Sequence, residues 1–137
     1  MSIEAATAAF QRLVAALDPS RDPASLRAAV IDEIRIDRHA PGERGVAPVM
    51  ESFTGIAEVE RWFARTPPVV RFGLAGASWR DGDAWGVEYT IDAGEFHNGG
   101  IWIARLAGDG RIAFLSHCPF ALRGQPPGSP HAHTHEP

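Results

Sequence analysis

The chain has 137 residues, of which 45% are hydrophobic and 22% are charged, a composition that predicts one globular domain. Its formal net charge of −4 indicates no basic face, and no stretch is apolar enough to cross a membrane, so we expect neither nucleic acid nor a membrane as a partner. The first residues lack the basic start of a signal peptide, and Cys118 is the single cysteine, so we expect a reducing, cytoplasmic location and no internal disulfide.

Two helices are predicted at the N-terminal end. Apolar residues recur at helical spacing over residues 3–17, with Ser2 as the expected N-cap and Asp18 followed by proline as the stop. A second, shorter helix is expected to begin at Asp22, with Pro23 in its first turn. The buried side of this second helix is predicted to be Leu26, Ala29 and Val30.

The apolar period then changes from 3.6 to 2 in the segment IRIDRHAP, which predicts a strand from Ile34. Ile34 and Ile36 alternate with Arg35, Asp37 and His39, so the three ionisable side chains share one face of that strand. That face either looks into a pocket, where Asp37 could do chemistry, or it is a solvated face with an ordinary Arg35–Asp37 ion pair. The sequence leaves both alternatives open.

A return strand and a third helix follow. The segment VMESF is a candidate strand that pairs with the one before it, after a loop that contains APGERGVAP. Thr54 is the expected cap of a helix over residues 55–65, which the TPP segment ends. The apolar stripe of this helix is predicted to be Ile56, Val59, Trp62 and Phe63.

The remaining chain is predicted to be β structure followed by a tail. Four runs, residues 69–79, 84–96, 100–107 and 111–120, are separated by Asp81-Gly82, Asn98-Gly99 and Asp109-Gly110, which are strong hairpin signals. Gly94 marks either a bulge in the second run or an earlier turn than Asn98-Gly99. Residues 123–137 are too polar and proline-rich to pack, and we expect the histidines there to be unordered rather than to bind metal. These histidines are His131, His133 and His135.

The order of elements predicts an α+β fold shaped like a cone over residues 1–122. A curved mixed or antiparallel sheet, built from a short hairpin and a four-strand meander, would be covered by three N-terminal helices and would enclose an apolar pocket. Both faces of the last two strands are rich in apolar residues, and one layer of helices covers only one face. We therefore expect a homodimer through the sheet.

The segments FTGIAEVERWF and GDGRIAFLSHCPF, in this order of elements, resemble the nuclear transport factor 2-like superfamily over about residues 2–122. Within it, the chain looks like the SnoaL-like polyketide cyclases and the ketosteroid isomerases. The resemblance implies that Asp37, at the end of DEIRID, is a general base. It also places Trp102 where the isomerases have an oxyanion-hole acid. The carboxylate–imidazole pair of the cyclases would be Asp37 with His117 or His39.

The resemblance implies proton transfer next to a carbonyl, as in an isomerase or a cyclase, on a small apolar or aromatic molecule. The expected catalytic residues are Asp37, His117 and Trp102. The expected ligand-binding residues are Arg35, His39, Trp62, Phe63, Trp85, Tyr89, Phe96 and Leu115. We expect no cofactor and no metal. The alternative is a non-catalytic ligand-binding or dimerisation module, in which the aromatic residues fill the core and His117 is a satisfied core histidine.

Overall fold

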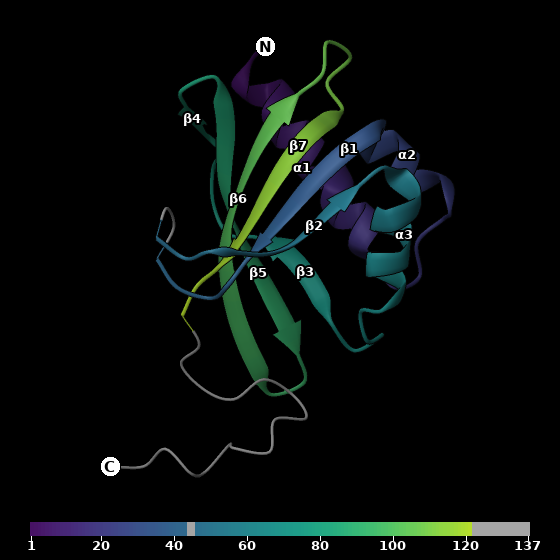
Figure 1. Ribbon diagram of the computed structural model, residues 1–137, viewed down its shortest axis with the longest axis vertical. Coiled ribbons are helices and arrows are strands. Elements are labelled where there is room, and N and C mark those ends of the chain that lie inside the picture. The colour runs from purple at the N-terminus through teal and green to yellow at the C-terminus, as the bar shows by residue number, and fades with distance from the viewer. Residues whose placement is uncertain (44–45, 122–137) are drawn as a thin grey trace.

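The computed structural model describes residues 1–43 and 46–121, and in them it has three helices and a seven-stranded sheet (Figure 1). The expected domain boundary at residue 122 and the three histidines of the tail lie outside the described residues. The helices are α1 (Ile3–Leu17), α2 (Ala24–Ala29) and α3 (Ile56–Ala64). The strands are β1 (Val30–His39), β2 (Val49–Thr54), β3 (Arg71–Leu74), β4 (Trp79–Asp81), β5 (Ala84–Ala93), β6 (Phe96–Leu106) and β7 (Ile112–Pro119).

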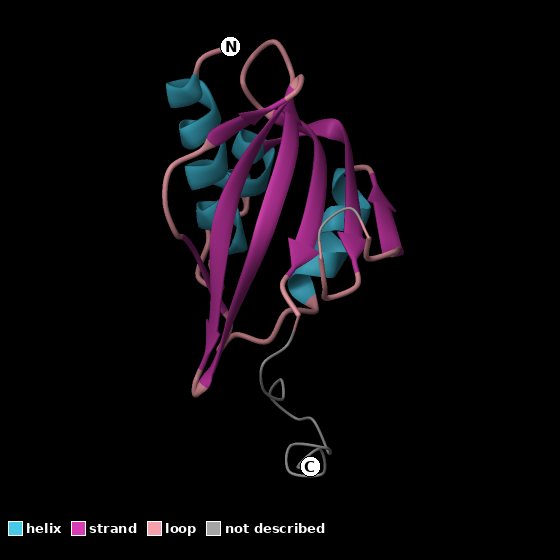
Figure 2. Cartoon of the chain, turned by 90° about the vertical axis from the view of Figure 1, so that its left-hand side faces the viewer, coloured by secondary structure: helices cyan, strands magenta, loops and turns pink. Residues whose placement is uncertain are grey.

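The sheet places the last strand of the chain at its centre. Its order is β2-β1-β7-β6-β5-β3, and β4 pairs with β5 beside this path. The β1–β7 pairing is parallel, with Ile36 opposite Leu115, whereas all other pairings are antiparallel. The strands curve strongly, and the helices lie behind one face of the sheet in Figure 2. This arrangement confirms the predicted α+β cone.

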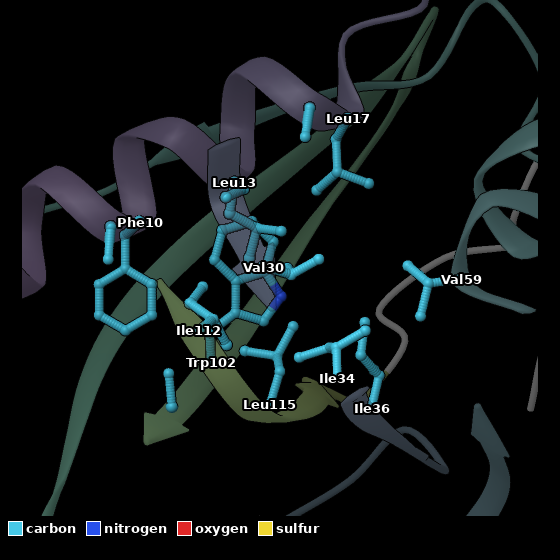
Figure 3. Close-up of a cluster of buried hydrophobic side chains, with 14 of the residues drawn as sticks. Phe10, Leu13, Leu17, Val30, Ile34, Ile36, Val59, Trp102, Ile112 and Leu115 are labelled. Carbon is cyan, nitrogen blue, oxygen red and sulfur yellow. The ribbon is translucent and has the colours of Figure 1, made fainter. Parts of the chain in front are cut away.

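Helix α1 forms as its sequence predicts and supplies the main cover of the inner, concave face. The Ser2 hydroxyl accepts a hydrogen bond from the backbone N–H of Ala5 at 3.1 Å, which confirms the expected N-cap. Phe10, Leu13 and Leu17 of α1 point toward the indole of Trp102 and the apolar side chains of the sheet (Figure 3). Burying large apolar side chains in this way stabilises the fold by about 1.5–3 kcal/mol each.

The hairpin between β5 and β6 turns earlier than the Asn-Gly signal predicts. The turn is at Gly94, where φ is +66°, and Asn98 and Gly99 lie inside β6. Gly99 serves a close approach between strands instead, because a Cβ there would lie 2.5 Å from the backbone carbonyl oxygen of Tyr89. The Asn98 side chain donates to the backbone carbonyl of Phe120 at 3.4 Å. The turn therefore lies at the earlier of the two positions that the sequence allowed.

Three smaller boundaries also differ from the sequence-based expectation. The run over residues 69–79 forms two strands, β3 and β4, with a break that contains Gly76 at φ +126°. The N-cap of α3 is Gly55, at φ +88°, rather than Thr54, whose backbone N–H donates to the Glu58 carboxylate at 2.9 Å. Val30 begins β1 rather than ending α2. The first difference adds one strand to the predicted meander, and the other two leave the set of elements unchanged.

Ile112 lies in the core together with Leu115. Strict alternation along the last strand would instead place these two residues on different faces of the sheet. Both residues are buried, because the pairing of β6 with β7 shifts its register between Arg105 and Leu106. Figure 3 shows both side chains below Trp102. Because of this irregularity, β7 contributes both Ile112 and Leu115 to the core, although they are three positions apart in the strand.

Candidate functional site

The structure decides which face of β1 looks inward. Ile34 and Ile36 are both 0% exposed and point toward Val59 of α3 (Figure 3). Arg35 and Asp37 therefore lie on the outer, convex face, the second of the two alternatives that the sequence left open. The inner face of β1 continues instead to Arg38, whose pairing partner on β7 is His117.

Asp37 has a well-satisfied environment on the outer face. Its carboxylate accepts hydrogen bonds from the Ser52 hydroxyl at 2.7 Å and from Arg35 Nε at 3.0 Å, and its side chain is 13% exposed. Burial raises the pKa of this carboxyl, but the hydrogen bonds and the charges of Arg35 and His39 outweigh it and leave the pKa below its ordinary value. The group is therefore held in its ionised form.

His39 is the last residue of β1 and follows an irregularity in the pairing with β2. Its Nδ1 lies 3.0 Å from the backbone carbonyl oxygen of Ala47, so this nitrogen carries a proton and donates. The ring is tied to the loop between β1 and β2 by this bond.

His117 lies on the inner face of β7 and is buried, with 9% of its surface exposed. Trp102 Nε1–H donates a hydrogen bond to His117 Nδ1 at 2.9 Å, so Nδ1 has no proton. The Nε2–H then donates to the Tyr89 hydroxyl oxygen at 3.3 Å. Burial is the largest cause that lowers the pKa of His117, and together with the charges of Arg38 and His39 it brings this pKa to about 3. The imidazole is neutral, and both of its nitrogens are engaged.

Tyr89 reaches His117 because the neighbouring strand has no side chain at the crossing point. Gly100 pairs with Tyr89, and a Cβ at Gly100 would lie 2.6 Å from the tyrosine hydroxyl oxygen. The Tyr89 ring stacks on the imidazole, with 5.0 Å between ring centroids, and on the Trp102 indole at 4.6 Å. Burial raises the pKa of the Tyr89 hydroxyl, so this group stays protonated.

Side chains nearly fill the space inside the cone. The cavity inside the cone measures about 10 Å³, close to the ~10–15 Å³ that a single water molecule needs. Its lining residues are Leu13, Leu17, Trp62, Phe63, Phe72, Trp102, Leu115 and His117.

Next to this cavity, an open pocket of about 400 Å³ leads to solvent, and we call this pocket the mouth of the cone. Its lining residues are Arg38, Glu51, Trp62, Arg65, Thr66, Pro67, Val70, Phe72, Ile91 and His117. Trp62, Phe72 and His117 line both spaces, so they separate the closed interior from the open mouth. The Trp62 ring is held by stacking on Phe53, with 4.7 Å between the ring centroids and 10° between their planes.

Three charged side chains stand at this mouth. Arg38 donates from Nε at 3.0 Å and from Nη2 at 2.7 Å to the same carboxylate oxygen of Glu51, Oε1. Arg65 Nη2 lies 3.6 Å from the other oxygen, Oε2. The hydrogen bonds from Arg38 are the largest cause that lowers the pKa of the Glu51 carboxyl, so the acid is ionised between two guanidinium groups.

The structure brings together part of the predicted ligand-binding set. Trp62, Phe63, Trp102, Leu115 and His117 surround the cavity, with Tyr89 behind His117. Trp85 is buried at the other end of β5, where the Arg80 guanidinium lies 4.8 Å from its ring. Phe96 begins β6 next to the hairpin turn. Neither these two residues nor Arg35, Asp37 and His39 line the mouth.

The charged residues of the mouth were not predicted from the sequence. Arg38 follows Ile34 and Ile36 at the same two-residue spacing and therefore shares their face, whereas the predicted site was placed on the opposite face of this strand. Glu51 shares a face with Phe53 in the same way, and Phe53 is buried. Arg65 and Phe72 come from α3's C-terminal end and from β3, and no local pattern relates them to β1.

Two other kinds of site are absent from the part of the chain that the structure describes. No group of three or more histidine, cysteine, aspartate or glutamate side chains there could hold a metal ion. No described helix is both long enough and apolar enough to span a bilayer.

Comparisons with known proteins support the fold. No family model matches the sequence, and no curated protein matches it either. An isomerase candidate of the SnoaL-like family from Agrobacterium tumefaciens superposes with a TM-score of 0.66 at 18% identity, over 85% of this chain and 97% of the other. A candidate ketosteroid isomerase from Kribbella flavida superposes with a TM-score of 0.65 at 16% identity, over 98% and 92%.

A computationally designed binder of 17-OHP is also similar, with a TM-score of 0.62 at 17% identity over 87% of this chain and 92% of the binder. Together these likenesses agree, at the level of fold, with the α+β cone that the sequence predicts. The chain has the cone fold of those proteins.

Proposed function

We propose that the protein binds a small, flat, mostly apolar molecule at the mouth of the cone. The observation that carries this proposal is the open pocket of about 400 Å³, with apolar walls from Trp62, Val70, Phe72 and Ile91 and a buried polar residue, His117, at its floor. Pockets of about 300–1,000 Å³ with mostly apolar walls and a few convergent polar groups are typical of small-molecule sites. The designed binder of 17-OHP supports the proposal, because its fold is similar.

The ligand would lie at the mouth rather than deep in the cone. The cavity of about 10 Å³ is too small for a ring, and α1 and Trp102 close it from within. An aromatic molecule can instead pack beside the exposed parts of Trp62 and Phe72, where ring contacts add about 0.5–1.5 kcal/mol each to the burial of apolar area.

The geometry supports binding better than proton transfer of the isomerase or cyclase type. A general base works best with a pKa near the operating pH and a free lone pair within reach of the substrate. The Nδ1 lone pair of His117 accepts the Trp102 N–H, its Nε2 carries the proton, and its pKa is about 3. Asp37 points away from the mouth, on the other face of the sheet. We therefore propose a non-catalytic ligand-binding protein.

Binding is tested with a neutral probe, 2-naphthamide, by isothermal titration calorimetry. We expect saturable one-to-one binding in the micromolar to millimolar range, and we expect Trp62→Ala to weaken it at least about fivefold because an aromatic wall is lost. Trp79→Ala is the matched control, since Trp79 covers Gly86 on β5 and does not line the mouth. No saturable binding, or equal losses in the two variants, would contradict the proposal.

We further propose that a second copy of the chain covers the outer face of the sheet. Ile101, Ile103 and Phe114 are half-buried there, Cys118 is buried, and no described helix lies over them. Light scattering at micromolar concentration should give twice the chain mass of 14.8 kDa, and a value of one chain mass would contradict the dimer. The single cysteine supports a cytoplasmic location for this assembly.

A further inference from the structure

We propose that the molecule bound at the mouth carries a carboxylate or another compact anionic group, which lies against the guanidinium of Arg65 beside that of Arg38. This inference rests on the proposed function and adds the chemical class of the ligand. It starts from the charges at the mouth and from the incomplete pairing of Arg65.

The charged residues of the mouth do not balance. Among its described lining residues are two arginines, Arg38 and Arg65, and one acid, Glu51, while His117 is neutral. The one negative charge is shared between two positive charges, so the mouth has a formal charge of +1 on a chain whose net charge is −4. An anionic ligand would therefore meet a locally favourable potential, and a cationic one would be repelled.

The two arginines are paired to very different degrees. Arg38 makes two hydrogen bonds to Glu51 Oε1, and its side chain is 30% exposed. Arg65 lies 3.6 Å from Glu51 Oε2, which is too long for a hydrogen bond, and its side chain is 61% exposed. Guanidinium groups bind carboxylates best when two parallel N–H groups can donate at once. Arg65 has donors for such a contact at the edge of the pocket.

The position of Arg65 fits a ligand with a flat apolar body. Trp62 precedes Arg65 by three residues on α3, a spacing that places the two side chains next to each other on one side of the helix. A molecule whose ring packs on Trp62 therefore has Arg65 within reach of a substituent at the edge of that ring. The anionic group would stay at the rim, where water still solvates it, so little desolvation opposes binding.

The expected preference is moderate, because other charges and solvent reduce it. Arg65 is the C-cap of α3, and the partial negative charge of about half a unit at that helix end offsets part of the formal charge. Exposed ion pairs contribute little, and hydrogen bonds to charged groups contribute somewhat more. We therefore expect an anion to bind about five- to tenfold more tightly than its neutral analogue.

Three naphthalene probes that share the ring and carry substituents of similar size but different charge test the proposal by calorimetry. We expect 2-naphthoate to bind about five- to tenfold more tightly than 2-naphthamide, and 2-naphthylmethylammonium to bind most weakly. Raising the salt concentration from about 0.05 M to 0.5 M should remove most of the preference for naphthoate, with little effect on naphthamide.

Two substitutions should shift naphthoate binding in opposite directions. Glu51→Gln removes the competing carboxylate and should tighten naphthoate binding about threefold or more, whereas Arg65→Gln should bring it down to the affinity of naphthamide. Arg61→Gln is the matched control, because Arg61 is an exposed cation one helical turn away that does not line the mouth. It should leave both affinities within about 1.5-fold. For Glu51→Gln and Arg65→Gln, the readout is the ratio of naphthoate affinity to naphthamide affinity in the same variant, because this ratio cancels any change in the apolar wall.

The outcomes separate this inference from the proposed function. If naphthamide binds and naphthoate binds no more tightly, the ligand class is wrong and the binding function stands. If none of the three probes binds, both proposals fail. If Arg61→Gln lowers naphthoate affinity as much as Arg65→Gln does, the preference comes from the general surface charge and the site assigned here is wrong.

Discussion

The two faces of the sheet give the ionisable residues of β1 and β7 very different environments. On the outer face, Asp37 pairs with Ser116 and is kept ionised by Ser52 and Arg35. On the inner face, one residue further along each strand, His117 is kept neutral by burial. The two faces therefore shift both groups further toward the state that each residue type already favours at neutral pH. The outer face stabilises the carboxylate through hydrogen bonds and charges, whereas the inner face disfavours the imidazolium through burial.

The same change in an apolar residue should have very different effects on the two faces. Ile34→Ala removes a side chain that is 0% exposed beneath α3, and we expect it to lower the free energy of unfolding by about 2–5 kcal/mol. Ile103→Ala, on the half-buried outer face, should lower it by about 1 kcal/mol in the monomer. Urea denaturation measures both. Equal losses at low protein concentration would show that the outer face is packed as tightly as the core.

As the pH falls, the first loss of stability should come from His117 on the inner face. The folded pKa of His117 is about 3, against an ordinary value of 6.5, so below pH 6.5 the unfolded chain takes up a proton that the folded protein does not. Stability should therefore fall with decreasing pH, by up to about 1.4 kcal/mol per pH unit, or about 2 kcal/mol between pH 6.5 and 5. Asp37 acts in a lower window: its contribution is present above the ordinary pKa of 3.8 and is lost as pH falls below it.

The variant His117→Gln tests whether His117 causes this pH dependence of stability. An amide in that position does not titrate, so its free energy of unfolding should change much less between pH 6.5 and 5. Urea titrations at four or five pH values give the slopes for both proteins. A slope that is unchanged in His117→Gln would place the acid sensitivity on other groups.

Polar contacts on the two faces should also differ in strength, by a smaller amount. Trp102→Phe removes the N–H that the buried Nδ1 of His117 accepts, and we expect a loss of about 1–3 kcal/mol because that acceptor is left unsatisfied. Asp37→Asn keeps the shape of the outer-face group and should lower stability by less than about 1 kcal/mol. Thermal and urea unfolding at pH 7.5 compare the two. A larger loss for Asp37→Asn would reverse the ranking of the faces.

The smallest effect is expected from the tail. Residues 124–137 contain four prolines, two glycines and no large apolar side chain, so we expect their deletion to leave the melting temperature within a degree or two. Differential scanning fluorimetry of the full and shortened chains measures this. A drop of several degrees would mean that the tail supplies cover that the described helices do not provide.

The sequence predicted the elements of the fold better than it predicted their junctions. Apolar spacing and Ser2 identify α1, because a helix is specified by neighbours along the chain. The β5–β6 turn was ambiguous, since Asn98-Gly99 resembles a turn locally. The small residues at Gly99 and Gly100 are required by Tyr89 on the adjacent strand, and that contact exists only in the folded sheet.

The sequence predicted only those residues of the site that are buried because they are apolar. Trp62, Phe63 and Leu115 line the cavity, as apolar residues of a helix stripe and a core strand are expected to do. The orientation of β1 depended on which side α3 covers, which is a tertiary relation that the alternation of residues leaves undetermined. For that reason the sequence pointed to Asp37, whereas the charged residue of the mouth on this strand is Arg38.

The central place of β7 has a consequence for how the chain folds. The parallel pair of β1 and β7 joins Ile36 to Leu115, which lies roughly 80 residues later in the chain. Pairings between such distant segments make folding slow. During synthesis, which proceeds at about 5–20 residues per second, β1 and β6 each present an open edge until β7 emerges and inserts between them. A nascent chain stalled before Ile112 therefore exposes two unpaired strand edges at once and is the species most prone to aggregate.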